Sequence, residues 1–222
     1  MIHTVFFDVG GTLVTGESTL KVIADRLDPK QSEPIFRYMV DRFMEIYLDE
    51  NPPRFYSIKE LLTLSTRLAA EEFGTPDLSH QTVEIYRWHH MNNDHLYDDT
   101  VATLENLKDK GLRLILISDA DADVLEEQLR MFDILKYFDG TIISSHTKAY
   151  KPSDPVVRKA LEYCNEPLSG ILFVGDTIVD LKTAEKMKVR SALINRNGRF
   201  KYKADHQITH LNQIFDIIDN TI

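Results

Sequence analysis

Acidic residues, a serine and a lysine follow four short apolar segments of this chain. The apolar segments are unbroken and rich in β-branched residues, as is typical of strands buried on both faces. They are Thr4–Phe7, Arg113–Ile117, Thr141–Ile143 and Ile171–Val174. The polar residues that follow them are Asp8, Ser118, Asp119, Lys151, Asp176 and Asp180. Because ligands bind beyond the carboxyl ends of the strands in a parallel sheet, we expect these side chains to meet in one site.

These residue types suit the transfer of a phosphoryl group. Carboxylates from different strands form an oxygen-rich site for Mg²⁺, which keeps several waters and binds phosphate oxygens. A lysine and a hydroxyl group neutralise and orient an anion, and Gly10 and Gly11 let backbone N–H groups approach it. An aspartate beside metal and phosphate is a known kind of covalent nucleophile. Each residue alone is also ordinary in loops and at helix N-termini, but packing alone does not predict the whole set.

Helical patterns alternate with these strands. They cover Asp99–Lys110, Asp121–Met131, Asp154–Tyr163, Val179–Met187 and Leu211–Ile218. Ser191–Ile194 is a fifth candidate strand. This alternation predicts an α/β fold with a doubly wound parallel sheet and helices on both faces.

The segment from about Glu17 to about His95 has a different pattern, without a convincing strand. Three long stretches in it carry apolar residues at spacings of three and four, which predicts amphipathic helices. They are Gln31–Asp49, Ile58–Phe73 and Ser79–Met91. We therefore expect an all-helical insertion after the first strand, with the sheet resuming near Leu96.

Composition narrows the class of protein. The chain has 222 residues, a net charge of -9 and one cysteine, Cys164. It has no signal-peptide pattern and no apolar run near the roughly 20 residues of a membrane helix, so no membrane partner is expected. The single cysteine fits a reducing compartment, and a cytoplasmic location is therefore expected. The acidic balance argues against nucleic-acid binding. The basic segment Arg196–Lys203 is therefore interpreted as an exposed loop before the last helix.

Four segments together resemble the motifs of the haloacid dehalogenase superfamily in order and spacing. They are "FFDVGGTLV", "ILISDAD", "YKPSDPVV" and "ILFVGDTIVDLKTA". The helical insertion resembles the C1 cap of subclass I. The resemblance implies a Rossmann-like core at residues 1–15 and 96–222 with a cap at 16–95. It also implies a Mg²⁺-dependent hydrolase of a small phosphorylated substrate, a phosphoric monoester or an acyl phosphate. Whether the chain is a monomer or a homodimer is left open.

The resemblance also implies a role for each matching residue. Asp8 would be the nucleophile and a metal ligand, and the Gly10 carbonyl would bind the same ion. Lys151 would steady the nucleophile and the phosphate. Asp176 would complete the metal site, supported by Asp180 from the next helix. The phosphoryl group would be bound by Ser118 with the Gly11 and Asp119 amides.

Gly10 departs from the family pattern. Phosphatases of the family carry a second aspartate there, which protonates the leaving oxygen and then activates water, worth on the order of 10²- to 10⁴-fold. Its absence leaves alternatives open: a phosphatase with another acid or a good leaving group, a protein that binds a phosphorylated ligand with little turnover, a 2-haloacid dehalogenase, or a phosphonatase. Intact Asp176 and Asp180 favour the Mg²⁺-dependent phosphatase.

Two further positions have alternative interpretations. Asp119 stands where relatives carry asparagine, and we favour a helix-capping role for it over a substitute acid/base. His89 and His90 are neighbours on a predicted helix and point to different sides. One of them could face the substrate and supply the missing proton, whereas a second metal site is disfavoured. Trp88 and the tyrosines of the insertion are interpreted as packing residues.

Overall fold

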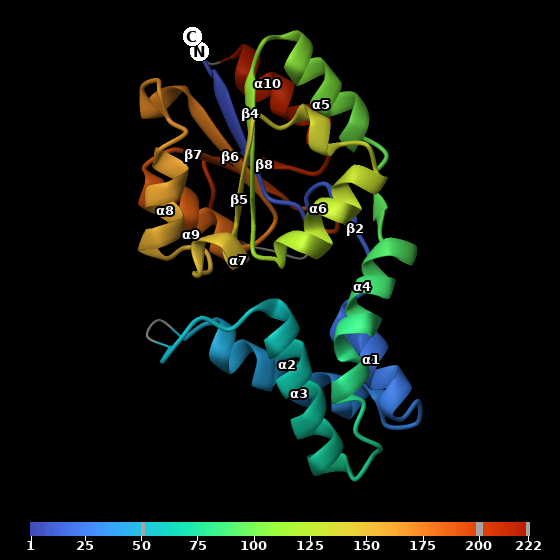
Figure 1. Cartoon of the computed structure of the whole chain (residues 1–222). Coiled ribbons are helices and arrows are strands. Elements are labelled where there is room, and N and C mark those ends of the chain that lie inside the picture. Colours follow the sequence, from blue (N-terminus) through green and yellow to red (C-terminus); the bar gives the residue numbers. More distant parts are fainter. Residues whose placement is uncertain (50–51, 199–201, 221–222) are drawn as a thin grey trace.

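The computed structural model describes residues 1–49, 52–198 and 202–220, and its centre is a six-stranded parallel sheet (Figure 1). The strand order is β5-β4-β1-β6-β7-β8. The strands are β1 (Thr4–Phe7), β4 (Arg113–Ser118), β5 (Gly140–Ile143), β6 (Ile171–Gly175), β7 (Arg190–Ile194) and β8 (His206–Ile208). The predicted α/β class with a parallel sheet is confirmed.

Helices cover both faces of the sheet, because adjacent residues of each strand point to opposite sides. Phe7 packs into one apolar core with α5 (Thr100–Asp109), α6 (Ala122–Met131) and α10 (Ile214–Asp219). Phe6 packs into the other with α8 (Asp154–Leu161) and α9 (Ile178–Met187), and its ring stacks on Phe173. The remaining short helices are α7 (Ser144–Thr147) and the 3₁₀ turns Ser79–Gln81, Leu135–Tyr137, Leu168–Gly170 and Leu211–Gln213.

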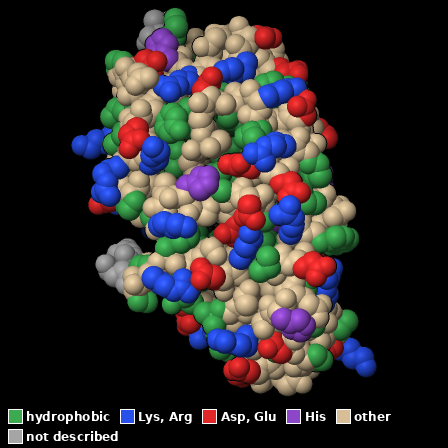
Figure 2. All heavy atoms as spheres, viewed as in Figure 1, with side chains coloured by type: hydrophobic (Ala, Val, Ile, Leu, Met, Phe, Trp, Pro, Cys, Tyr) green, Lys and Arg blue, Asp and Glu red, His purple; other side chains and the backbone are tan. Residues whose placement is uncertain are grey.

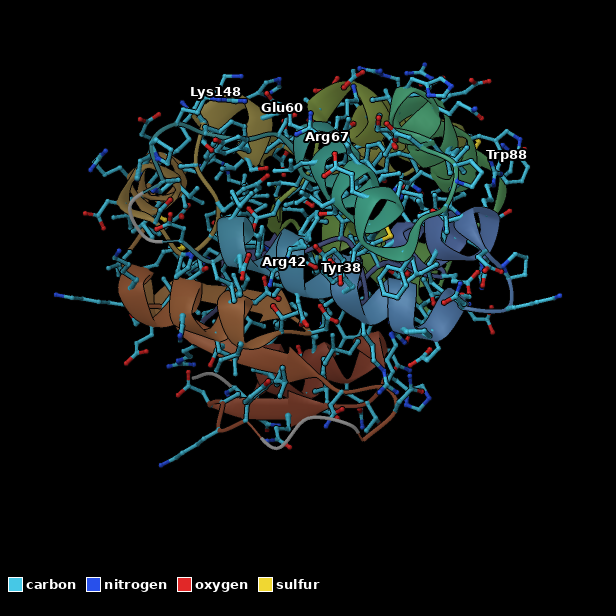
Figure 3. All side chains as sticks on the ribbon, turned by 90° about the horizontal axis from the view of Figure 1, so that it is seen from below. Tyr38, Arg42, Glu60, Arg67, Trp88 and Lys148 are labelled. Atoms are coloured by element: carbon cyan, nitrogen blue, oxygen red, sulfur yellow. The ribbon has the colours of Figure 1, made fainter. Side chains whose placement is uncertain are left out.

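A helical insertion separates β1 from β4 and has its own apolar core. It comprises α1 (Thr19–Leu27), α2 (Ser32–Tyr47), α3 (Ile58–Phe73) and α4 (Thr82–Asn92). Ile23, Ile35 and Met39 are fully buried within it. Helix α2 lies alongside α3 (Figure 3), and the insertion occupies the lower part of Figure 1, at the end toward which β1 runs.

The structure adds elements that the sequence pattern did not predict. A two-stranded antiparallel ribbon of β2 (Val14–Thr15) and β3 (His95–Leu96) joins the insertion to the sheet. Helix α1 was missed because its start has neither a side-chain cap nor an acidic first turn. Strand β8 was missed because it is a three-residue edge strand with one buried side chain.

The surface is electrostatically mixed on the face shown in Figure 2, where Lys and Arg side chains are interspersed with Asp and Glu side chains. No helix in the described part of the chain combines the length and the apolarity needed to cross a membrane. Residues 199–201 of the predicted basic loop lie outside the described residues.

Candidate active site

The Lys151 ammonium group lies at the centre of a buried cluster of charges. Its Nζ donates to Asp8 Oδ1 and to Asp180 Oδ1, at 2.6 Å in each case. The three side chains are at most 10% exposed. One carboxylate oxygen from each of Asp8, Asp176 and Asp180 lies within 4.8 Å of the others. The structure thus brings together the predicted nucleophile, lysine and acidic residues.

Strand register explains this convergence. Strands β1 and β6 are parallel neighbours with Phe7 opposite Val174, and the Asp8 N–H donates to the Val174 carbonyl at 3.0 Å. Asp8 and Asp176 therefore leave the sheet at the same edge.

Asp180 is held in place by a capping box at the start of α9. The Thr177 N–H and hydroxyl both donate to Asp180 Oδ2, at 3.0 and 2.6 Å, while Thr177 Oγ1 accepts from the Asp180 N–H. Thr177 is a positioning residue that the sequence analysis missed. Its signal, a threonine three residues before an acid at a helix start, is readable in "DTIVD".

Burial and crowding shift the proton affinities of the cluster. Burial raises the pKa of Asp8 well above its usual value, against the attraction of Lys151. Burial and the neighbouring Asp180 raise the pKa of Asp176 to about 7. Burial opposes the charged form of Lys151, but Asp180 and Asp8 outweigh it and raise its pKa. The carboxylates outnumber the one cation, so the site favours an additional positive charge.

The donor set fits a divalent cation. Asp176 Oδ1 is buried and has no hydrogen-bond partner among the described residues, which is costly for a polar atom unless something binds it. Both oxygens of Asp180 already accept hydrogen bonds, from Lys151 and from Thr177. Asp8 and Asp176 are therefore the carboxylates best suited to hold Mg²⁺, whose preferred protein ligands are oxygens.

The two glycines after Asp8 occupy different environments. Gly11 has φ +76°, a conformation that favours glycine, and a Cβ there would overlap the Asp176 carboxylate. Gly10 is exposed, and a Cβ there would meet nothing within 4 Å. Gly11 is thus fixed by the geometry of the site, whereas Gly10 is not. The metal-binding role of the Gly10 carbonyl stays a prediction.

The capping role predicted for Asp119 is wrong. The N-cap residue of α6 is Asp121, and the Asp119 carboxylate instead accepts from the Tyr47 hydroxyl at 2.7 Å and from the Lys151 N–H at 3.1 Å. Burial raises the pKa of Asp119. Tyr47 lies on α2, 72 positions away, so no local pattern could have indicated this contact. Asp119 therefore links the insertion to the loop that carries Lys151.

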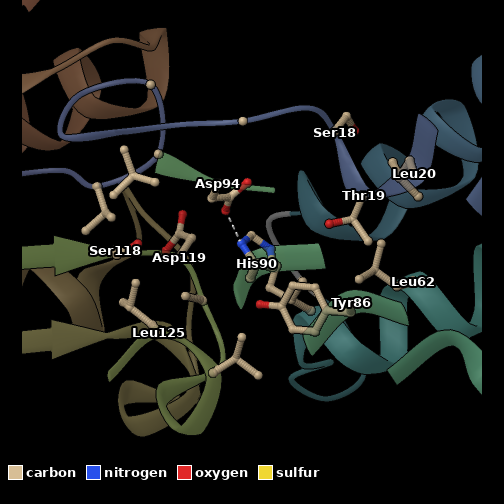
Figure 4. A pocket seen from close by; sticks show the side chains of 18 of the residues that line it. Ser18, Thr19, Leu20, Leu62, Tyr86, His90, Asp94, Ser118, Asp119 and Leu125 are labelled. Atoms are coloured by element: carbon tan, nitrogen blue, oxygen red, sulfur yellow. Dashed lines mark hydrogen bonds and ion pairs between the residues drawn. The ribbon is translucent and has the colours of Figure 1, made fainter. Parts of the chain in front are cut away.

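A cavity of about 490 Å³ lies between the strand ends and the insertion. Gly10, Gly11, Ser118 and Asp119 line it from the sheet side. The side chains of α1, α3 and α4 face them in Figure 4. The predicted phosphate-binding residues Gly11, Ser118 and Asp119 thus share one cavity.

The two adjacent histidines differ, as predicted from their positions on a helix. His89 is fully buried and its Nε2 lies 2.7 Å from the Glu17 carbonyl oxygen. His90 lines the cavity, with its Nδ1 2.5 Å from Asp94 Oδ2 (Figure 4). Trp88, interpreted as a packing residue, is instead 48% exposed at the rim of the insertion (Figure 3).

Comparisons with known proteins agree with this arrangement. A model of the haloacid dehalogenase-like hydrolases matches residues 2–188. Phosphoglycolate phosphatase of Aquifex aeolicus (strain VF5) is 24% identical over 196 residues, covering 86% of this chain and 84% of that protein. Pyrophosphatase PpaX of Bacillus pumilus (strain SAFR-032) is 22% identical over 228 residues, covering 98% and 96% respectively.

Solved structures give the same fold. The structure of L-2-haloacid dehalogenase from Xanthobacter autotrophicus matches with a TM-score of 0.79 at 17% identity and covers 100% of both chains. At this identity the match concerns the fold and carries no statement about the reaction.

Replacing Lys151 by methionine is expected to destabilise the protein strongly in the absence of metal. The substitution leaves Asp8 and Asp180 buried without their cation, which costs about 3–5 kcal/mol. Urea unfolding in EDTA at pH 7.5 measures the free energy of unfolding. The matched control is Lys182→Met, an exposed lysine on α9. A similar loss of stability in both variants would contradict the central role of Lys151.

Gly11→Ala and Gly10→Ala form a second matched pair. Gly11→Ala is expected to lower the free energy of unfolding by at least about 1–2 kcal/mol, the cost of a side chain at positive φ. It should also weaken Mg²⁺ binding, because the new methyl group displaces Asp176. Gly10→Ala should change both by little. Calorimetric Mg²⁺ titration and urea unfolding check this, and equal effects in the two variants would refute it.

Proposed function

This chain belongs to the haloacid dehalogenase-like hydrolase family, and on that premise we propose that it is a Mg²⁺-dependent phosphatase of a small phosphorylated compound. One observation carries the proposal: Asp8, Asp176 and Asp180 place carboxylate oxygens within 4.8 Å of one another, and Asp176 Oδ1 has no partner. This arrangement calls for a cation that also binds phosphate oxygens. The names of the phosphatase relatives support the same class of reaction.

Asp8 is the proposed nucleophile. A carboxylate oxygen of Asp8 bonds to phosphorus while the bond from phosphorus to the leaving oxygen breaks, and water then cleaves the aspartyl-phosphate to release phosphate. Lys151 holds Asp8 by its Oδ1 and fixes the orientation of its side chain. When bound, Mg²⁺ would neutralise charge on the phosphoryl oxygens.

Ser118 and the Gly11 and Asp119 amides are proposed to bind the phosphoryl group. All three residues line the cavity, and Ser118 ends β4, the neighbour of β1. Donors fixed before the substrate arrives stabilise the charge of a transition state most effectively.

Gly10 limits the proposed reaction. Without a carboxylic acid at this position, departure of an alkoxide lacks the usual proton donor. The proposed enzyme therefore works best on substrates with a stable leaving group, such as an acyl phosphate or an aryl phosphate.

Residues 16–95 are proposed to act as a cap over a core formed by residues 1–15 and 96–222. Contacts between the two parts support the position of the cap over the core. The Tyr47 hydroxyl donates to Asp119, and Asp121 Oδ2 accepts from the Lys59 N–H at 2.9 Å. The proposed cap closes the cavity on the side opposite the strand ends.

A 2-haloacid dehalogenase is the second candidate, because Gly10 is favourable for a reaction in which the leaving halide needs no proton. The cluster of three carboxylates counts against it, because the family's dehalogenases work without metal. The phosphatase is therefore preferred.

The proposal predicts that Asp8→Asn and metal removal each abolish phosphate release. The assays use 4-nitrophenyl phosphate and acetyl phosphate with about 5 mM Mg²⁺. Asp8→Asn should lower kcat by about 10³-fold or more, because the nucleophile is lost. EDTA should have a comparable effect. Asp109→Asn, an exposed residue of α5, is the control.

Other outcomes discriminate the alternatives. Turnover that is unaffected by Asp8→Asn would refute the nucleophile assignment. Halide release from 2-chloropropionate without metal would establish the dehalogenase. Mg²⁺-dependent binding of a phosphate mimic with no turnover of any ester would establish a binding protein instead.

Gly10→Asp is expected to accelerate hydrolysis of alkyl phosphates. The space beside Gly10 is free, and the new carboxyl group would supply the missing proton transfer, worth on the order of 10²-fold. Acetyl phosphate should respond less, because its leaving group needs no proton. Gly10→Asn, similar in size but unable to transfer a proton, is the matched control. An unchanged rate in a folded Gly10→Asp variant would show that another group already donates the proton.

A further inference from the structure

Three acids line the cavity beside the carboxylate cluster, and no lysine or arginine of the described residues does. Among the described residues, its charged lining side chains are Glu17, Asp94 and Asp119, and neither lysine nor arginine contributes to it. Lys151 lies next to the cavity but is bound by Asp8 and Asp180. The environment of the substrate's organic part is therefore negative or neutral.

Three cations of the insertion are paired with carboxylates. Lys59 Nζ binds Asp123 at 2.6 Å, and Lys21 Nζ binds Asp25 at 2.5 Å. Arg42 binds Glu45 at 2.8 Å. None of these three cations lines the cavity.

His90 is the one described lining residue that can become positively charged on protonation, and it already has a carboxylate partner. Its Nδ1 lies 2.5 Å from Asp94 Oδ2. The buried Gln128 amide donates to the same oxygen and to the His90 carbonyl, each at 2.8 Å. A protonated His90 would thus be neutralised by Asp94 and would leave little charge for a ligand.

The wall toward the insertion is mostly apolar, with hydroxyl groups of Ser18, Thr19 and Tyr86 beside an apolar part. The apolar part is formed by Leu20, Val40, Phe43, Met44, Ile58 and Leu62. Burying an uncharged organic group against these side chains is favourable, because apolar surface is removed from water. A charged group would lose its hydration there without a compensating partner.

The charge balance of the carboxylate cluster, where the phosphoryl group would bind, also disfavours a second anionic group. When Asp8, Asp176 and Asp180 are all ionised, they and Lys151 carry a net charge of -2, which one divalent cation balances. The phosphoryl group of the substrate already adds negative charge to this balanced cluster, and a second anionic group would add more. Such a group would face the carboxyl groups of Glu17, Asp94 and Asp119 and no lysine or arginine among the described lining residues, so no opposite charge would favour its binding.

We infer that the substrate carries a single phosphoryl group on an uncharged or cationic, partly apolar organic group, and that phosphoesters with a second anionic group are discriminated against. This rests on the proposed phosphatase function and adds to it the chemical class of the substrate. The specificity comes from the insertion, whose side chains form the apolar wall.

A matched set of aryl phosphates tests the inference. The wild-type protein with Mg²⁺ is assayed on 4-carbamoylphenyl, 4-(aminomethyl)phenyl and 4-carboxyphenyl phosphate, which differ in charge but little in size or leaving group. The expected kcat/KM is at least about tenfold higher for the neutral and cationic esters than for the carboxylate. The difference should shrink at high salt, because salt screens repulsion between charges.

Met44→Arg provides a second, independent readout. A guanidinium group on this wall is expected to raise kcat/KM for 4-carboxyphenyl phosphate relative to 4-carbamoylphenyl phosphate, whereas Met44→Gln, of similar length and uncharged, leaves that ratio unchanged. Equal or preferred turnover of the carboxylate by the wild-type protein would overturn the inference and leave the phosphatase proposal standing. Absence of turnover of all three esters would overturn both.

Discussion

The pairing of the buried Lys151 ammonium group with Asp8 and Asp180 is the interaction on which the site depends. Removing these charges from water is expensive, and the cost is offset only when all three are in contact and hydrogen-bonded. Asp8 follows β1, Lys151 lies in the loop before α8, and Asp180 lies in the first turn of α9. The cluster therefore forms only when these segments have all reached their final positions.

The close packing of two glycines against the buried carboxylates is the second constraint on the site. A Cβ at Gly11 would overlap the Asp176 carboxylate, and a Cβ at Gly175 would overlap Asp180. The carboxylates crowd together because glycines leave them room. The same crowding raises the pKa of Asp176 and of Asp8, so the edge of the sheet holds an electrostatic strain that an added cation relieves.

The insertion and the edge of the sheet together form a cavity that is partly open to solvent. Tyr47 from α2 binds Asp119, and its ring lies 4.6 Å from that of Tyr150. The N-terminus of α3 meets the start of α6 through the Lys59 N–H and Asp121. The loops at the sheet edge supply the Asp8, Lys151 and Asp180 cluster, and the insertion supplies most of the apolar wall of the cavity.

Local signals in the sequence determined the strands β1, β4 and β6, the helices between them, and the types of residue at the strand ends. Buried parallel strands are continuous apolar runs, and the chain leaves each one at the same edge of the sheet. Strand β8 and helix α1 lacked such signals, since one is a short edge strand and the other begins without a capping side chain.

Only the tertiary structure decided what each polar side chain contacts. Asp119 begins a stretch that locally favours helix capping, yet its partners are Tyr47 and the Lys151 N–H, distant in sequence. Packing likewise decides three other features. They are the space for a side chain at Gly10 but not at Gly11, the contact of His90 with Asp94, and the lack of cations in the described cavity lining. Hydrogen bonds and charge pairs form between groups that are near in space. A periodic pattern along the chain does not show which distant segments come together, so it cannot indicate these contacts.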